Sequence, residues 1–351
     1  MVFSKTLIDW YLKNKRDLPW RNTKDPYKIW LSEIILQQTR VAQGLPYYLK
    51  FAETFPTVHD LAASPLEKVL KVWQGLGYYS RARNLHETAV FISGELKGQF
   101  PDNYKDLIKL KGVGDYTASA IASTCYNEPV AAVDGNVYRV LARYFNIDTP
   151  INSSKGITEF RDLSQELLGN EHPWYYNQAI MEFGATHCTP KQPYCQTCPF
   201  SKSCLALKYN KIGELPVKIK KGKIKKRFFN YIVFRTRDDQ TILEKRSGKG
   251  IWEGLYQFPL IETTEMLSAA EFSTFEEFID IKGDDVSEVT LYNDDPVIHK
   301  LTHQHIYTRF WIVDKITVNQ NSVKLSKVKD YPVPVLIANF LKESDLANSV
   351  Y

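Results

Sequence analysis

The sequence predicts a mainly α-helical N-terminal part followed by an α+β C-terminal domain. Residues 1 to about 205 carry apolar side chains at i, i+3 and i+4 spacing between short Pro/Gly turns, and no long alternating strand interrupts them. After residue 228 the pattern changes to short β-type runs with a few helices. Between the two lies a run of lysine and arginine with little apolar content, which is typical of a linker. We therefore expect a helical domain over residues 1–210, a basic linker over 211–227 and a second domain over 228–351.

Each predicted element follows from its apolar pattern. In the first domain we expect helices at residues 4–15, 26–42, 45–54, 66–73, 80–94, 103–110, 115–126, 135–145, 157–169 and 173–185. In the second domain, the β-type runs 228–235 and 241–246 flank a turn-like Asp-Asp-Gln, a pattern that predicts a hairpin. A β-rich run and two helices are expected at residues 297–314, 271–280 and 333–341.

The composition is that of a globular protein. The 351 residues are 44% hydrophobic and 24% charged, with a net charge of +5. No apolar run reaches the length of about 18 residues that a membrane span needs. The first residues lack the basic and apolar segments of a signal peptide, so we expect a cytoplasmic protein without a membrane partner. The odd count of five cysteines argues against a disulfide framework.

A strongly apolar predicted helix carries a single carboxylate, Glu33. Asp25 can cap this helix, and Pro26 suits its first position. Burial disfavours an ionised carboxylate, so a buried Glu33 would have a raised pKa and could act as a general acid. Alternatively, Glu33 belongs to a solvated stripe with Gln37 and Arg40, and this stretch alone does not separate the two interpretations.

The most specific motif is a cysteine quartet with the spacing Cys188-x6-Cys195-x2-Cys198-x5-Cys204. Four thiolates in the short loop 188–204 can surround one metal centre without help from the rest of the fold. Structural zinc sites usually pair two Cys-x2-Cys knuckles across a longer loop, whereas one tight pair with a wide gap suits a 4Fe–4S cluster better. We expect the cluster, with zinc or free thiols as the alternatives.

Residues 110–118, Leu-Lys-Gly-Val-Gly-Asp-Tyr-Thr-Ala, predict a tight turn between two helices. Gly112 and Gly114 allow backbone N–H groups to approach an anion, and the following helix adds its N-terminal dipole. This pattern, over about residues 104–126, is typical of a helix-hairpin-helix motif, which binds a DNA phosphate without reading base sequence. An ordinary αα-hairpin turn is the alternative.

An apolar stretch over residues 130–133 ends at Asp134, where another predicted helix begins. Asp134 could simply cap that helix. A cap can also be a catalytic carboxylate, because the helix dipole and the N–H donors hold it ionised. We therefore expect a lowered pKa for Asp134 and a raised pKa for Glu33. Two carboxylates with opposed pKa shifts are the usual pair for cleaving a glycosidic bond through an oxocarbenium-like transition state.

These motifs occur in one order along the chain, together with two further ones. They are Leu18-Pro19-Trp20-Arg21, Ser32-Glu33-Ile34-Ile35-Leu36-Gln37-Gln38-Thr39, Gly75-Leu76-Gly77-Tyr78-Tyr79-Ser80-Arg81-Ala82-Arg83-Asn84, the hairpin, Val133-Asp134-Gly135-Asn136 and the cysteine quartet. On these motifs the chain resembles the adenine DNA glycosylases of the MutY family, within the endonuclease III superfamily of helix-hairpin-helix enzymes. The resemblance covers about residues 5–205, and the remainder more loosely resembles the Nudix-like C-terminal domain of that family.

The resemblance implies an enzyme of base excision repair that removes adenine paired with 8-oxoguanine or guanine in double-stranded DNA. It implies that Glu33 protonates adenine at N7 and that Asp134 stabilises the cationic sugar, with Tyr116 and Asn136 positioning the two carboxylates. The positions that it assigns to the adenine pocket are Arg16, Leu18, Trp20, Arg21 and Val41. Those that it assigns to the strand opposite are Gln38, Thr39, Leu76 and Tyr78. With this function we expect a monomer located at the bacterial nucleoid.

One position separates the two chemistries of this superfamily. Members that also nick the strand carry a lysine immediately before the Thr-Ala of the hairpin, where its amine forms a Schiff base with the sugar. Here Tyr116 occupies that position, which implies a monofunctional glycosylase. The competing interpretations are an endonuclease III-like glycosylase and lyase, and a non-catalytic DNA-binding iron–sulfur protein.

The second domain lacks the array of glutamates with which a Nudix hydrolase binds magnesium, so we expect a binding module. Leu301-Thr302-His303 resembles a family loop often written Phe-Ser-His that senses 8-oxoguanine, with Leu and Thr as departures. Thr302 and His303 are therefore expected to contact DNA. The alternative is that these residues, with His299 and His305, form a polar strand edge or a weak metal site. The basic linker is expected to follow the phosphate backbone.

Overall fold

The computed structural model describes residues 2–219, 222, 224–318 and 322–344, and the chain divides into two compact units. The first unit comprises Met1–Ala63 and Asn84–Lys221, and the second comprises Ser64–Arg83 and Gly222–Tyr351. Ser64–Arg83, which the sequence places inside the helical domain, thus groups with the C-terminal residues. Strand β1 (Lys225–Arg235) also begins inside the stretch that was expected to be linker.

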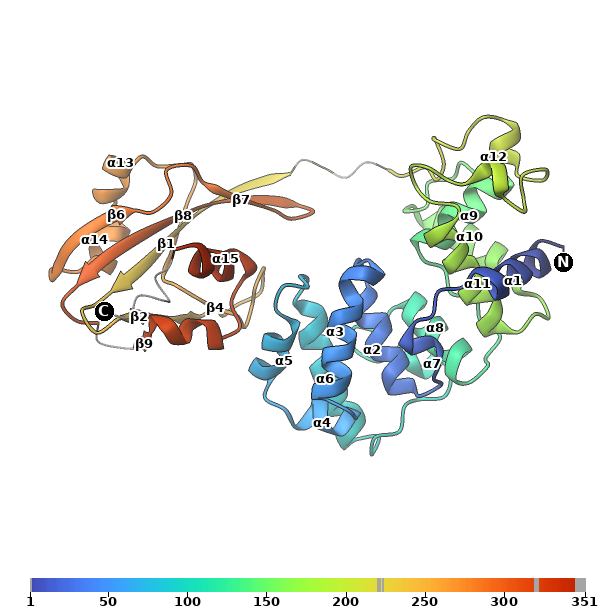
Figure 1. Cartoon of the computed structure of the whole chain (residues 1–351), viewed down its shortest axis with the longest axis horizontal. Coiled ribbons are helices and arrows are strands. Elements are labelled where there is room, and N and C mark those ends of the chain that lie inside the picture. Colours follow the sequence, from blue (N-terminus) through green and yellow to red (C-terminus); the bar gives the residue numbers. More distant parts are fainter. Residues whose placement is uncertain (1, 220–221, 223, 319–321, 345–351) are drawn as a thin grey trace. The chain divides into compact units, whose positions relative to one another are not determined.

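The first unit is helical (Figure 1). Its α-helices are α1 (Val2–Asn14), α2 (Pro26–Leu36), α3 (Val41–Thr54), α4 (Val58–Ala63), most of α6 (Ser80–Gly94), α7 (Tyr104–Leu107), α8 (Asp115–Cys125), α9 (Gly135–Phe145), α10 (Ser154–Leu168), α11 (Pro173–Thr186) and α12 (Leu205–Lys208). Two 3₁₀ turns, Pro19–Arg21 and Cys195–Thr197, complete it. The short helices α4 and α12 have no counterpart among the predicted elements.

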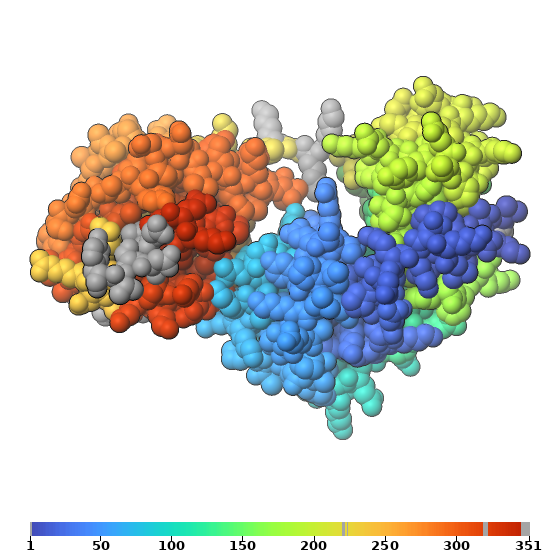
Figure 2. All heavy atoms as spheres, in the orientation of Figure 1, coloured from blue at the N-terminus to red at the C-terminus, as the bar shows by residue number. Residues whose placement is uncertain are grey.

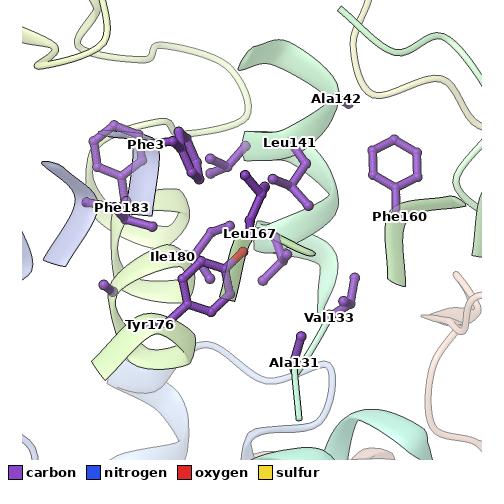
Figure 3. Close-up of a cluster of buried hydrophobic side chains, with 14 of the residues drawn as sticks. Phe3, Ala131, Val133, Leu141, Ala142, Phe160, Leu167, Tyr176, Ile180 and Phe183 are labelled. Carbon is purple, nitrogen blue, oxygen red and sulfur yellow. The ribbon is translucent and has the colours of Figure 1, made fainter. Parts of the chain in front are cut away.

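A hydrophobic core joins α1, α9, α10 and α11 (Figure 3). Phe3 of α1, Leu141 of α9 and Phe183 of α11 are all buried in it. The ring of Phe3 also lies 5.0 Å from that of Phe200, just beyond the cysteine pair. In Figure 2 the dark blue N-terminal residues accordingly lie against the yellow-green residues near 200. The N-terminal helix therefore stabilises the cysteine loop as well as the bundle.

Helix α2 is shorter than its apolar pattern predicts. The Asp25 side chain caps it by accepting a hydrogen bond from the Tyr27 N–H at 2.9 Å, as expected. The helix ends at Leu36, however, and not at residue 42. Gln38 adopts a left-handed backbone with φ of +56°, which breaks the run before α3 begins at Val41. No glycine or proline marks this break, so the sequence gives no local signal for it.

The second unit contains α5 (Leu66–Trp73) and a five-stranded mixed sheet. The strands are ordered β5 (Leu260–Thr263), β1, β8 (Gln304–Lys315) and β6 (Val286–Leu291), with β7 (Val297–Lys300) also paired to β8. β1 and β8 run parallel and the other pairs antiparallel. The expected β-rich run over 297–314 is thus the β7–β8 hairpin.

Helices cover both faces of this sheet. On one face, Trp311 stacks on Phe272 of α13 (Ala269–Ser273), near α14 (Glu276–Lys282). On the other face, the neighbouring Phe310 stacks on Phe340 of α15 (Val335–Glu343) at 4.0 Å. The alternation of side chains along one strand explains why adjacent residues meet opposite layers. The predicted mixed fold class, helical followed by α+β, is confirmed.

The prediction that the runs 228–235 and 241–246 pair with each other as a hairpin is wrong. The turn forms, with the Asp239 N–H bonded to the Thr236 carbonyl at 3.0 Å. β2 (Gln240–Ile242), however, pairs with β9 (Ser322–Lys324), and β3 (Glu244–Lys245) pairs with β4 (Tyr256–Gln257). Strand β1 pairs with β5 on one side and with β8 on the other. In the described part of the chain, no helix combines the length and apolar character needed to cross a membrane.

Candidate active site

One cavity of the first unit, of about 670 Å³, collects most of the predicted site residues. All four predicted catalytic residues line it, namely Glu33, Tyr116, Asp134 and Asn136. So do Arg16, Leu18, Trp20, Arg21, Gln38, Thr39, Val41 and Gly114. These residues come from α2, the first residue of α3, α8, α9 and the connecting turns. Gln38 and Thr39 reach the cavity from the turn after α2 and not from the helix itself.

Glu33 is buried in the wall of this cavity, with only 8% of its surface exposed. Burial raises its pKa from the ordinary value to about 7. A hydrogen bond from Tyr116 and the charge of Arg21 oppose this rise, while the neighbouring charge of Asp134 adds to it. The interpretation of Glu33 as part of a solvated stripe is therefore wrong, and the side chain can hold a proton near neutral pH.

Tyr116, at the start of α8, lies close enough to Glu33 and Asp134 to interact electrostatically with both. Burial raises the pKa of its hydroxyl well above the usual value, and Glu33 and Asp134 raise it further. The same hydroxyl lies 3.2 Å from the Met181 sulfur on α11. Tyr116 therefore remains a neutral phenol that donates its proton in a hydrogen bond and carries no reactive amine.

Asp134 caps α9 with its side chain. Its carboxylate accepts hydrogen bonds from the Asn136 and Val137 N–H groups, at 2.8 and 2.9 Å. It also accepts one from the Asn136 side-chain amide at 2.6 Å. The amide of Asn136 can face only one way, because its oxygen accepts from the Arg139 guanidinium at 2.8 Å and arginine is solely a donor. Asn136 thus presents its N–H₂ group to Asp134.

The expected lowering of the Asp134 pKa is wrong. Burial raises the pKa of this carboxyl, although the hydrogen bonds from Val137 and Asn136 and the charge of Arg139 oppose the rise. The sequence predicts correctly that Asp134 caps a helix, but it does not predict how deeply the Asp134 carboxyl is buried. Asp134 still differs from Glu33, because three donors converge on it and stabilise its ionised form.

Arg139 links this carboxylate pair to the cysteine loop. Its Nη2 donates to Asn136 and to the Gly184 carbonyl, and its Nε donates to the Cys188 carbonyl at 2.8 Å. Arg139 is 8% exposed. A single buried guanidinium therefore holds the partner of Asp134 and the first cysteine of the quartet in fixed relation.

Glu182 on α11 also lines the cavity and is not among the residues predicted from the sequence. It accepts three hydrogen bonds from Arg16, two of them at 2.7 Å, and one from Arg21 at 2.7 Å. Burial alone would raise its pKa, but the bonds from Arg16 and Arg21 more than offset this and hold it at about 2. A lone carboxylate in an apolar helix was the signal that identified Glu33, and it would have identified Glu182 as well.

The predicted hairpin turn is formed between α7 and α8. Gly112 has a φ of +78°, and a Cβ at this position would lie 2.8 Å from the Asn84 side chain, so only glycine fits. Gly114 caps α8, and open space surrounds it. Lys111, just before the turn, pairs with Glu87 at 2.6 Å. The turn thus leaves the N-terminus of α8 accessible.

The four cysteines Cys188, Cys195, Cys198 and Cys204 line a second cavity of the first unit. Burial raises the pKa of Cys198 to about 11, and the three other thiols also raise it, so all four lie within electrostatic reach. The described residues contain no group of three His, Cys, Asp or Glu placed to hold a single metal ion. Four thiols around one cavity are a donor set that a 4Fe–4S cluster can use.

Four predicted DNA-contacting residues, Leu76, Tyr78, Thr302 and His303, lie in the second unit. Tyr78 has a φ of +49° and is half exposed, and its hydroxyl lies 2.8 Å from the Thr302 hydroxyl. Leu76 is buried, and His303 follows Thr302 in the turn between β7 and β8. The His299 ring lies 5.6 Å from that of Trp252. The structure thus brings two predicted lesion-contacting residues together from segments far apart in sequence.

Two family models match the chain. Residues 31–165 match the HhH-GPD superfamily of base excision DNA repair proteins, and residues 230–343 match the NUDIX domain. The first match includes Glu33, Tyr116 and Asp134, and the second spans most of the mixed sheet.

Named relatives agree with these models. An adenine DNA glycosylase of Buchnera aphidicola subsp. Baizongia pistaciae is 35% identical over 328 residues, which cover 92% of this chain and 90% of the relative. The adenine DNA glycosylase of Homo sapiens is 43% identical over 214 residues, or 58% of this chain and 39% of the relative. A solved structure of a thermostable thymine-DNA glycosylase, 31% identical, superposes with a TM-score of 0.55 over 59% of this chain and 96% of that one. The chain belongs to the adenine DNA glycosylase family and is a DNA N-glycosylase of base excision repair.

Proposed function

We propose that this enzyme is a monofunctional glycosylase that excises adenine paired with 8-oxoguanine or guanine in double-stranded DNA. The observation that carries the proposal is the meeting of Glu33, Tyr116 and Asp134 in one cavity. One carboxyl can keep a proton near neutral pH, the other is held by three donors, and a phenol stands between them.

In this mechanism Glu33 is the general acid. With a pKa of about 7, a substantial fraction of Glu33 is protonated at neutral pH. The acid transfers its proton to N7 of the flipped adenine, which becomes a neutral leaving base when the N-glycosidic bond breaks. The electron pair of that bond goes to the base, and positive charge develops on the sugar. Tyr116 positions Glu33 through their hydrogen bond.

Asp134 stabilises the oxocarbenium-like sugar through its negative charge. Its carboxylate is oriented by Asn136, which Arg139 orients in turn. Water then adds to the sugar and loses a proton, which leaves an abasic site. A base inside a duplex cannot reach these groups, so the adenine must first rotate out of the stack. The Arg16–Glu182–Arg21 cluster forms part of the cavity that receives it.

DNA binding is assigned to the hairpin turn and the basic segments. The open N-terminus of α8 after Gly114 suits a phosphate oxygen. Two solved structures with the same fold are titled as complexes of endonuclease III with DNA, which supports this assignment. We further propose that the enzyme acts as a monomer in the cytoplasm, at the bacterial nucleoid, where its substrate lies.

Cys188, Cys195, Cys198 and Cys204 are proposed to hold a 4Fe–4S cluster. When bound, the cluster would supply iron–sulfur bonds that fix the loop 188–204. The chain itself contributes Arg143, which is buried and donates to the Thr189 and Pro190 carbonyls and lies 3.5 Å from the Cys188 sulfur. Arg139 transmits the position of this loop to Asn136.

Recognition of the opposite base is assigned to Tyr78 and Thr302 in the second unit. The turn that carries Tyr78 is anchored on both sides. Before it, Lys71 donates to the carbonyls of Lys329 and Tyr331 and to the side chain of Gln74. After it, Arg83 pairs with the Glu253 side chain at 3.0 Å. The two hydroxyls are therefore presented as one preorganised element.

The test of the proposed function is release of free adenine from duplexes that differ only in the base opposite it. We expect fastest release opposite 8-oxoguanine, slower release opposite guanine, and little opposite cytosine or thymine. A matched duplex with thymine opposite guanine tests whether this enzyme releases thymine, the base named for the structurally similar thymine-DNA glycosylase. Release of thymine without release of adenine would refute the proposal.

Borohydride is expected to trap little covalent enzyme–DNA adduct during turnover. Tyr116 cannot form a Schiff base, and Lys111 is held by Glu87 outside the cavity lining. The measurement is denaturing electrophoresis of a labelled duplex after reduction, with an AP-lyase glycosylase as the positive control. Trapping as efficient as that of the control would assign a lyase function.

The substitution Lys71→Met is expected to lower the preference for 8-oxoguanine over guanine by roughly fivefold, the equivalent of about 1 kcal/mol of hydrogen bonding. The reason is that the anchor of the Tyr78 turn is lost. The measurement is the ratio of single-turnover excision rates on the two duplexes. Lys71→Arg should restore the ratio, and Lys68→Met, an exposed lysine on the same helix, should not change it. An unchanged ratio in Lys71→Met would remove this anchor from the recognition of the opposite base.

A further inference from the structure

The imidazole of His187 lines the same cavity as the four cysteine thiols. His187 lies at the C-terminus of α11, immediately before Cys188. Its ring stacks on Phe183, with 5.0 Å between centroids and 23° between planes, and Trp10 meets it edge-on at 5.7 Å. Aromatic neighbours therefore fix the orientation of this ring.

The Nε2 atom of His187 is buried and has no hydrogen-bond partner within the described residues. An unsatisfied buried donor or acceptor costs about 1–3 kcal/mol, so native structures rarely leave one. Phe183 and Trp10 offer no acceptor apart from their π systems, which are weak partners. The ring of Tyr194 lies 5.8 Å from that of His187, and its hydroxyl forms no hydrogen bond with Nε2. The unsatisfied Nε2 therefore indicates a hydrogen-bond partner that the described protein atoms do not supply.

A cluster in this cavity would supply such a partner. Its sulfide and thiolate sulfurs accept hydrogen bonds. The chain already places one donor beside a sulfur here, because Arg143 Nη1 lies 3.5 Å from Cys188 Sγ. His187 would be a second donor, approaching from α11 while Arg143 approaches from α9.

We propose that His187 donates a hydrogen bond from Nε2 to a sulfur of the 4Fe–4S cluster and thereby raises its reduction potential. The inference rests on the cluster assignment made above. A donor to a cluster sulfur stabilises the reduced state, which carries more negative charge, relative to the oxidised state. His187 is thus a tuning residue of the cofactor site and takes no part in breaking the glycosidic bond.

The experiment compares midpoint potentials of the purified holoenzyme and three variants by protein-film voltammetry. His187→Phe keeps an aromatic ring for Phe183 to stack on but removes the N–H group. His187→Gln places an amide N–H near the position of Nε2. Tyr194→Phe keeps the ring that lies 5.8 Å from the His187 ring and removes only the hydroxyl of a side chain that is 61% exposed. Iron and sulfide analysis of each sample establishes that the cluster is loaded.

We expect a more negative potential in His187→Phe, a potential near that of the native protein in His187→Gln, and no change in Tyr194→Phe. An unchanged potential in loaded His187→Phe would overturn the proposal. If that variant does not load, pulsed EPR of the native protein labelled with ¹⁵N-histidine decides. A hyperfine coupling from an imidazole nitrogen supports the hydrogen bond, and its absence overturns it. Native protein without iron would refute the cluster assignment itself and leave the excision assays unaffected.

Discussion

The substitution Glu33→Gln is expected to lower adenine excision by about 10²- to 10⁴-fold, the usual contribution of a general acid. Glutamine has nearly the same shape but no proton of comparable acidity. Glu33 is buried and forms no ion pair with the described residues, so we expect the fold to stay intact when an amide replaces its carboxyl group. The measurement is the single-turnover rate of adenine release from a duplex with adenine opposite 8-oxoguanine.

Duplex binding by Glu33→Gln should stay within a few-fold of the native protein, because the hairpin turn and the basic segments are unchanged. Glu53→Gln on the neighbouring helix α3 is the matched control, since Glu53 is an exposed carboxylate. It should excise adenine at the native rate. Retained excision in Glu33→Gln would remove Glu33 from the acid role.

The substitution Asp134→Asn is expected to slow excision by about 10²- to 10³-fold, as loss of a preorganised electrostatic group does. The asparagine oxygen can still cap α9 through the Asn136 and Val137 N–H groups, and asparagine is as good a cap as aspartate. The negative charge that we propose to stabilise the sugar is lost. Rate and thermal melting are measured on the same preparation.

The melting temperature separates catalysis from folding in this experiment. It should fall modestly in Asp134→Asn, because the new amide N–H₂ group faces that of Asn136 and one hydrogen bond, worth about 1 kcal/mol, is lost. Asp134→Ala should lose the cap as well, at a further cost of about 1 kcal/mol in the free energy of unfolding. An Asp134→Asn enzyme with the native rate would show that the residue is only a helix cap.

Where the sequence signal is local, the structure brings the predicted residues together in one cavity. Glu33 was identified because one carboxylate stood in an apolar helix, and Asp134 because it stood where a helix begins. The cysteine quartet needs only its own spacing. In each case the signal lies within a few residues, so neighbouring positions carry the information.

The prediction failed where distant contacts decide. The pKa of Asp134 depends on how deeply α9 lies in the bundle, which its capping motif does not reveal. The end of α2 at Leu36 is set by a left-handed Gln38, a conformation that glutamine has no intrinsic preference for. The pairing of β2 with β9 joins strands about 80 residues apart. Such features depend on tertiary packing, which overrides local propensity.

The grouping of Ser64–Arg83 with the C-terminal residues is the clearest case. Its helix α5 was predicted correctly, but its partners were not. Glu67 meets Lys245 and Tyr256, and Arg83 meets Glu253, at separations of 170 or more residues. The amino-acid sequence of α5 alone does not identify the residues with which it pairs. The connection of Tyr78 with Thr302 follows from this grouping and could not be derived from either segment alone.

The proposed mechanism depends on a protonated Glu33, and the pH dependence of the chemical step tests this most directly. Glu33 is protonated below its pKa of about 7 and ionised above it. The single-turnover rate of adenine release should therefore fall as pH rises through about 7, by about tenfold per pH unit on the alkaline side. Glu33→Gln should lack this inflection. A native rate that stays constant or rises from neutral to alkaline pH would contradict the account.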